Sequence, residues 1–202
     1  MKKKNSNTFT DIFLRAKHWQ IFSLTTLLPA ATVFAIVWWF KKNYLPDIGG
    51  FANQMEWILY LSILPLVVIP AVTQFGWLWS VVIGLQARVK EQSVRMNTAW
   101  FKVFFFFPFL VFGAVAAISW WYGREMMLMP IDYEGLIPIA IGLVMLFNQF
   151  CLIAIPYCAA KSIKVAEKQG KVSFWNPIGT LFLILIFPIG IWFLQPRINR
   201  LV

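Results

Sequence analysis

The sequence predicts an all-α membrane protein, a bundle of four transmembrane helices with an amphipathic helix before it and a fifth apolar segment after it. Of the 202 residues, 60% are hydrophobic and 13% are charged, whereas soluble domains are roughly 45–50% apolar and about 25% charged. The apolar residues gather in runs of about 20, the length that crosses a bilayer as a helix. These runs use most of the chain and leave no room for a separate soluble domain.

The N-terminal segment, residues 1–20, predicts a short amphipathic helix at the membrane surface. Phe9, Ile12 and Phe13 share one helical face, and Arg15 lies near the opposite one. This pattern suits a helix whose apolar side enters lipid while its cations face anionic headgroups. A basic start before an apolar run is also typical of a signal peptide, but tryptophans stand where a small-residue cleavage motif belongs. We therefore expect the segment to be retained.

Four apolar runs within residues 21–160 predict the membrane domain. Aromatic residues mark the ends of these runs, as expected for amphipathic rings that prefer the headgroup level. The run FFFFPF within the third fits a lipid-facing surface better than a cofactor site. The predicted spans are residues 21–40, 57–85, 103–121 and 136–160.

The distribution of basic residues predicts the orientation of the chain. Cytoplasmic connections of membrane proteins carry an excess of Lys and Arg. Most of the 18 Lys and Arg residues fall in the N-terminal segment and in the connections after the second and fourth spans. We therefore expect these parts to be cytoplasmic and the protein to lie in the cell inner membrane. The residues are Lys2, Lys3, Lys4, Arg15, Lys17, Arg88, Lys90, Arg95, Lys102, Lys161, Lys164, Lys168 and Lys171.

Residues 161–202 predict a basic cytoplasmic connection followed by the fifth apolar segment. Its apolar part, residues 178–194, has about 17 residues, the lower limit for a span. Pro188 and Gly190 interrupt it near the middle, where proline removes a backbone hydrogen bond. A fifth crossing would place Arg197 and the residues after it outside, against the charge distribution, whereas a re-entrant element would keep them cytoplasmic. Both readings of the segment stay open.

Polar residues are few at membrane depth. An ionisable residue near the middle of a span would favour a transporter, and the predicted spans have none there. The polar side chains that stand out are Thr73 and Gln74 in the second span and Asn148 and Gln149 in the fourth. Amides and hydroxyls in lipid usually bond neighbouring helices together. We expect these four to be packing contacts, and the alternative is that they line the pore of a small oligomeric channel or transporter.

The sequence offers no recognisable catalytic chemistry. It lacks a hydrolase serine elbow, a phosphate-cradling glycine loop and paired catalytic carboxylates. His18 has no cysteine or second histidine nearby to complete a zinc site. Cys151 and Cys158 lie two helical turns apart, too far to form a disulfide. We therefore expect no enzyme activity, no cofactor and no metal ion.

The predicted cytoplasmic cations suggest which partners the protein meets. Such residues attract the anionic headgroups of membrane lipids. They equally suit an acidic or nucleic-acid-laden cytoplasmic effector complex, although no aromatic-interleaved groove indicates direct sequence-specific nucleic-acid binding. The sequence thus favours a non-enzymatic membrane accessory or regulatory protein. The candidate contact residues are Lys90, Arg95, Lys161, Lys164 and Lys168.

Three stretches carry a family resemblance: AKHWQ at 16–20, AAKSIKVAE at 159–167 and FPIGIWFLQPRIN at 187–199. On these the chain resembles small multi-pass membrane proteins of the Bacteroidota over its full length. In size and span number it is also similar to the membrane accessory protein found beside the RNA-guided RNA nuclease of type VI-B CRISPR loci. That resemblance implies a non-enzymatic modulator that represses RNA-targeting interference in antiviral defence, and it carries over no catalytic residues.

Overall fold

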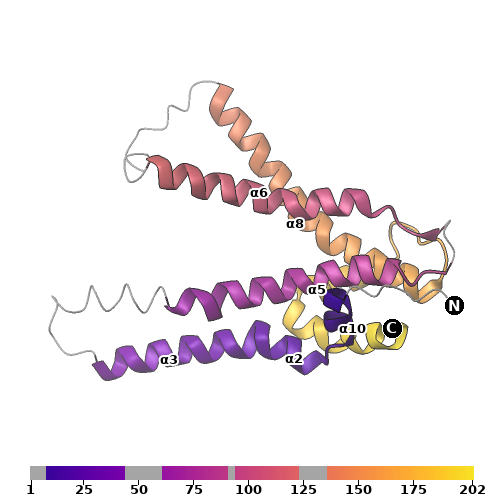
Figure 1. Cartoon of the computed structure of the whole chain (residues 1–202), viewed down its shortest axis with the longest axis horizontal. Coiled ribbons are helices and arrows are strands. Elements are labelled where there is room, and N and C mark those ends of the chain that lie inside the picture. The colour runs from indigo at the N-terminus through magenta and orange to yellow at the C-terminus, as the bar shows by residue number, and fades with distance from the viewer. Residues whose placement is uncertain (1–7, 44–60, 91–93, 123–135) are drawn as a thin grey trace.

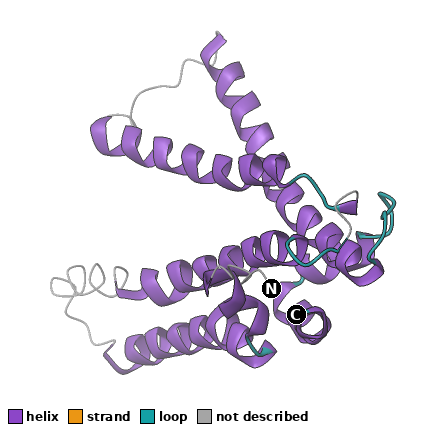
Figure 2. Ribbon diagram, turned by 45° about the vertical axis from the view of Figure 1, so that its right-hand side comes forward, coloured by secondary structure: helices purple, strands orange, loops and turns teal. Residues whose placement is uncertain are grey.

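The computed structural model describes residues 8–43, 61–90, 94–122 and 136–202, and it builds them from helices without a strand (Figures 1 and 2). Four of these helices are long and apolar enough to cross a membrane, as the sequence predicts. Lys2 to Lys4 and the predicted start of the second span at residue 57 lie outside the described residues. The four helices cover His18–Trp39, Leu61–Gln86, Thr98–Ile118 and Ile139–Lys168.

The first two long helices each contain one π-helical turn. The first comprises α2 (His18–Phe22), η1 (Ser23–Leu27) and α3 (Leu28–Asn43), and the second contains η2 (Leu64–Val68) and α5 (Ile69–Gln86). Pro29 and Pro70 follow the two π turns by two residues. Because proline cannot donate to the carbonyl four residues earlier and clashes with it, a locally wider turn accommodates the ring without ending the helix.

The long helices form two pairs that meet at one end of the molecule. Figure 1 shows the first pair, α3 and α5, side by side, and the second pair, α6 (Thr98–Tyr122) and α8 (Leu136–Lys168), spreading away from it toward the other end. The pairs join where α5 packs against α8. This end also holds α1 (Thr8–Arg15) and α10 (Phe187–Leu201) and is called the basic end below.

Helix α8 is longer than the predicted fourth span. The prediction ended that span at residue 160, but the helix continues to Lys168. Gln169 then adopts a positive φ of 47°, the left-handed conformation that commonly ends a helix. The first part of the predicted basic connection is therefore a helical extension, which holds its lysines at fixed positions.

The C-terminal apolar segment consists of two short helices joined by a sharp turn. Helix α9 (Ile178–Leu185) and helix α10 (Phe187–Leu201) are about 12 and 22 Å long, both shorter than the hydrocarbon core of about 30 Å. The chain turns at Ile186 with φ −92° and ψ 56°. Pro188 falls in the first turn of α10, where a missing N–H is tolerated. At Gly190 a Cβ atom would collide with the Leu183 carbonyl oxygen, so the close approach of the two helices requires glycine.

The N-terminal helix ends before the predicted residue 20 and has a different environment. Helix α1 ends at Arg15, and the next long helix begins at His18. Leu14 is buried against Gly84 of α5, and Phe13 lies against Gly76, where a Cβ would come within 2.8 Å of the ring. One side of α1 therefore packs on protein, whereas the sequence suggested that its apolar face meets lipid.

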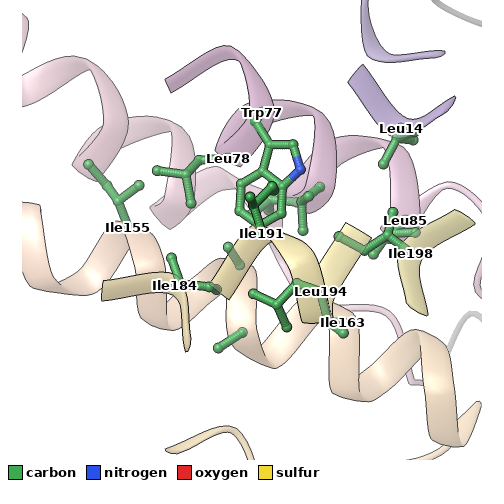
Figure 3. Close-up of a cluster of buried hydrophobic side chains, with 14 of the residues drawn as sticks. Leu14, Trp77, Leu78, Leu85, Ile155, Ile163, Ile184, Ile191, Leu194 and Ile198 are labelled. Atoms are coloured by element: carbon green, nitrogen blue, oxygen red, sulfur yellow. The ribbon is translucent and has the colours of Figure 1, made fainter. Parts of the chain in front are cut away.

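The hydrophobic core lies at the basic end, between α1, α5, α8, α9 and α10 (Figure 3). Trp77 and Leu85 of α5 are fully buried, as are Ile163 of α8 and Ile191 of α10. The outer parts of α6 and α8 instead expose large apolar side chains, such as Phe112. An apolar surface of this kind is stable in lipid. The core therefore fixes the basic end, and the membrane has to cover the rest.

Candidate functional site

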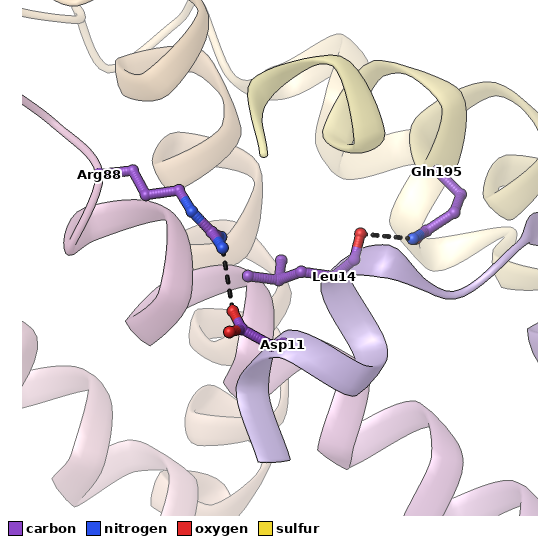
Figure 4. A network of polar contacts seen from close by, with 4 residues as sticks. All are labelled: Asp11, Leu14, Arg88 and Gln195. Carbon is purple, nitrogen blue, oxygen red and sulfur yellow. Dashed lines mark hydrogen bonds and ion pairs between the residues drawn. The ribbon is translucent and has the colours of Figure 1, made fainter. Parts of the chain in front are cut away.

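Gln195 of α10 links three elements at the basic end. Its side chain is fully buried, and its Oε1 accepts a hydrogen bond of 2.7 Å from the Trp77 indole Nε1. Its Nε2 carries two hydrogens and lies within hydrogen-bond distance of the backbone carbonyls of Phe13, Leu14 and Ala16, at 3.1, 3.2 and 2.9 Å. Figure 4 shows the contact with Leu14. Carbonyls at the end of a helix have no partner within it, so this amide caps α1 and joins it to α5 and α10.

An ion pair joins Asp11, in the first half of α1, to Arg88, which follows the end of α5 by two residues. Arg88 Nη2 lies 2.9 Å from Asp11 Oδ1, and about a fifth of each side chain is exposed (Figure 4). Asn199 adds a second link on the α10 side, because its Nδ2 donates to the Ala16 carbonyl at 3.4 Å. Helix α1 is thus attached through Asp11 and at its C-terminal end.

A second buried amide joins α5, α8 and the segment before α6. Gln86 Nε2 donates to Ser162 Oγ at 3.3 Å, and Gln86 Oε1 accepts from the Met96 backbone N–H at 2.9 Å. Both side chains are buried. The connection after α5 is therefore tied to α8 at Ser162.

The connection after α5 is also tied to the end of α8. The Lys90 backbone N–H donates to Gln169 Oε1 at 3.1 Å, and Gln169 Nε2 donates to the Ala166 carbonyl at 2.9 Å. Arg95 donates through Nε and Nη2 to the Val89 carbonyl at 3.0 and 2.9 Å. These bonds fix the backbone that carries the candidate cations.

All five predicted contact residues lie at the basic end, but they are used differently. Lys164 is paired with Glu167 at 2.7 Å. Arg95 is exposed, but two of its guanidinium nitrogens donate to the Val89 carbonyl. Lys161 is half-buried. The exposed ammonium groups of Lys90 and Lys168 bond to no residue that the structure describes.

Further cations complete a surface that we call the basic platform. Asn199 bonds to Ala16, so α10 brings its arginines to the same end as α1. Both acidic residues described at this end, Asp11 and Glu167, are already paired. The platform therefore has an excess of exposed positive charge. It comprises Arg15, Lys17, Lys90, Arg95, Lys161, Lys168, Lys171, Arg197 and Arg200.

The four polar residues at membrane depth are not joined to one another. Thr73 Oγ1 donates to the Ile69 carbonyl of its own helix at 2.8 Å, and Gln149 is exposed. Gln74 makes no hydrogen bond with Asn148 or Gln149 among the described residues. Asn148 Oδ1 is buried without a hydrogen-bond partner in the described part of the chain.

No grouping of metal ligands stands out in the described ranges, where three or more His, Cys, Asp or Glu side chains never cluster. The His18 ring instead packs against Trp192, with 4.4 Å between ring centroids. The cysteines Cys151 and Cys158 are both free thiols.

Sequence reasoning did not single out the two glutamines that organise the basic end. Each ends an apolar run, Gln86 after IGL and Gln195 after WFL. An amide that ends an apolar run, two residues before an arginine, is the signal that could have drawn attention to them. Their partners could not be read from spacing, because Trp77 lies 118 positions from Gln195.

In comparisons with known proteins, no protein-family model, curated protein or solved structure matches the chain. The functional argument therefore rests on the residues of the basic end.

Proposed function

We propose that the protein is a non-enzymatic, membrane-embedded accessory protein that presents the basic platform to an anionic partner in the cytoplasm. The observation that carries this proposal is that the exposed cations sit on a fixed scaffold whose described acidic residues are already paired. A scaffold held by Gln195 and Gln86 keeps its charges in place when a partner docks, which lowers the entropic cost of binding.

The orientation follows from the positive-inside rule. Because α10 returns to the basic end, Arg197 and Arg200 add to the cations of that side instead of opposing them. We place the basic end in the cytoplasm and the four long helices in the cell inner membrane.

We further propose that α9 and α10 form a re-entrant element. The Tyr157 hydroxyl donates to the Phe174 carbonyl at 3.4 Å, so the chain after α8 returns to the level of Tyr157 before α9 begins. Phe174 and Trp175 are mostly exposed there, as aromatic residues at a membrane interface often are. Helix α9 then enters the apolar layer, and α10 leads back to the same side.

Lipid headgroups alone do not account for the whole platform. If Tyr157 marks the membrane surface, Lys168 lies about 16 Å further along the axis of α8. The Debye length is about 8 Å at physiological ionic strength, and attraction to anionic lipid falls off within that distance. Lys168 and the adjoining Lys90 are therefore better placed for a soluble partner than for lipid.

The partner's chemistry is anionic, either an acidic protein surface or a nucleic-acid-laden complex. The similarity in size and span number to the accessory protein of type VI-B CRISPR loci makes an RNA-loaded nuclease the first partner to test. In that setting the proposed role is repression of RNA-targeting interference.

One observation favours a second candidate, a small oligomeric channel or transporter. The buried Asn148 Oδ1 has no partner among the described residues, and a helix from a second copy could supply a donor. Flux through liposomes should then fall when Thr73, Gln74, Asn148 and Gln149 are replaced by apolar residues. Unchanged flux would eliminate the channel.

The experiment for the preferred function is affinity isolation from gently solubilised membranes, using an N-terminal tag and mass spectrometry. We expect a soluble cytoplasmic assembly that is lost when salt is raised from low to high concentration. Recovery of the protein as a defined oligomer with no soluble companion at any salt concentration would contradict the accessory function.

A further inference from the structure

An apolar groove of about 310 Å³ lies between α1, α5 and α6. Phe9 of α1, Val72 and Phe75 of α5, and Phe105 and Phe109 of α6 are among its lining residues. Ring contacts between the helices form its floor, with Phe75 centred 5.8 Å from Phe105 and 5.1 Å from Phe109. Its size is at the lower end of the range of ligand pockets.

The groove runs along the membrane-spanning part of α5 and faces the lipid. From Trp79 to Ala71 the helix rises about 12 Å. Val72, Phe106 and Phe9 line the groove, yet each is more than half exposed. A hollow with this lining, on a surface that has to be covered by lipid, suits a flexible hydrocarbon chain better than a polar ligand.

A cation stands at the end of the groove nearest the basic end. Lys102 precedes Phe105 and Phe106 by three and four residues on α6, so the three side chains share one face of that helix. Lys102 is exposed. The Trp79 ring lies 5.8 Å from Phe101 and 5.0 Å from Phe105, which places Trp79 of α5 at about the level of Lys102. An ammonium group at this position can meet a headgroup phosphate while the acyl chain below lies in the groove.

We propose that this groove binds one anionic phospholipid, with an acyl chain against Phe75 and Phe105 and the phosphate beside Lys102. The bound chain touches Phe9, the residue by which α1 reaches the groove. Because α1 is also held by Gln195, Asn199 and Arg88, the lipid adds a further attachment for this helix. Lipid binding therefore favours the docked position of α1.

The test is native mass spectrometry of the full-length protein in detergent, titrated with phosphatidylglycerol or phosphatidylcholine. Two variants address the groove: Val72→Trp fills it, and Lys102→Gln removes the cation. Two matched controls lie elsewhere, Val33→Trp on the exposed surface of α3 and Lys171→Gln in the segment after α8. Hydrogen exchange of residues 8–15 reports whether α1 is docked.

We expect one phosphatidylglycerol per chain, retained in preference to phosphatidylcholine, and slower exchange in α1 when that lipid is bound. Val72→Trp should abolish this binding, and Lys102→Gln should weaken it about fivefold, while both controls bind as the native protein does. Retention by Val72→Trp equal to that of the native protein would overturn the proposal, as would equal affinity for the two lipids. If the native protein proved to be a dimer and Val72→Trp a monomer, the groove would be the contact with a second copy and the proposal would be overturned.

Discussion

Trp77 and Gln195 are joined by a buried hydrogen bond of 2.7 Å, although 118 positions separate them in the chain. The same amide group reaches the carbonyls at the end of α1. One side chain from the C-terminal element therefore sets the position of both the N-terminal helix and α5, and the basic platform depends on this contact.

Replacing Gln195 by Leu should destabilise the basic end. The Trp77 N–H and the α1 carbonyls would be left buried without their partner, which costs about 1–3 kcal/mol in the free energy of unfolding. Thermal unfolding in detergent measures the loss. Gln149→Leu is the control, because this amide is exposed and its replacement should change stability by less than about 0.5 kcal/mol. Equal effects of the two variants would show that the network contributes nothing.

Gly190→Ala should force α9 and α10 apart. The new Cβ would meet the Leu183 carbonyl oxygen, and overpacking of this kind costs about 1–3 kcal/mol of stability. Gly179→Ala is the matched control, because a Cβ at Gly179 meets nothing within 4 Å and alanine is a better helix former. We expect Gly179→Ala to be neutral or slightly stabilising in the same unfolding assay. A stability loss in Gly179→Ala as large as in Gly190→Ala would contradict the tight turn.

The Asp11–Arg88 ion pair should contribute little to global stability. About a fifth of each side chain is exposed, so water still reaches the pair, and we expect it near the upper end of the range of about 0.2–1 kcal/mol found for solvent-accessible pairs. A double-mutant cycle with Asp11→Asn and Arg88→Gln measures the coupling. We expect a coupling energy in that range that shrinks at high salt. A value near zero at low salt would mean that Gln195 and the packing of Leu14 hold α1 without help from this pair.

Lys164 and Lys168 should differ in partner binding although both lie near the end of α8. Lys164 is already paired with Glu167, whereas Lys168 is exposed and bonds to no residue in the described part of the chain. Lys168→Gln should therefore weaken binding of the anionic partner several-fold at low salt, and Lys164→Gln should weaken it less. The measurement is partner recovery over a salt series, and a larger effect of Lys164→Gln would contradict this assignment.

The re-entrant element predicts that both ends of the chain lie on the same side of the membrane. Epitope tags at residues 1 and 202 should both be cleaved by protease in inside-out vesicles and both be protected in right-side-out vesicles. A C-terminal tag with the opposite accessibility to the N-terminal tag would establish a fifth crossing.

The four long helices could be predicted from the sequence because length and apolar composition are local properties. The Lys164–Glu167 pair was also within reach, since residues three apart face each other on a helix. The roles of Gln195 and Gln86 were not, because their partners come from distant parts of the chain. The same limit applies to α1. Its apolar side is predicted to face lipid, because the sequence does not show that Gly76 and Gly84 of α5 provide a surface on which it packs.

The measurement that tests the central claim most directly compares two multiple variants of the full-length protein in the affinity isolation. One replaces Lys90, Lys161 and Lys168 by Glu, and the other replaces them by Arg, with membrane insertion of both verified first. If the platform docks an anionic partner, the Glu variant loses the soluble companion and the Arg variant retains it. Equal recovery of the companion by the two variants would contradict a role for the platform's charge.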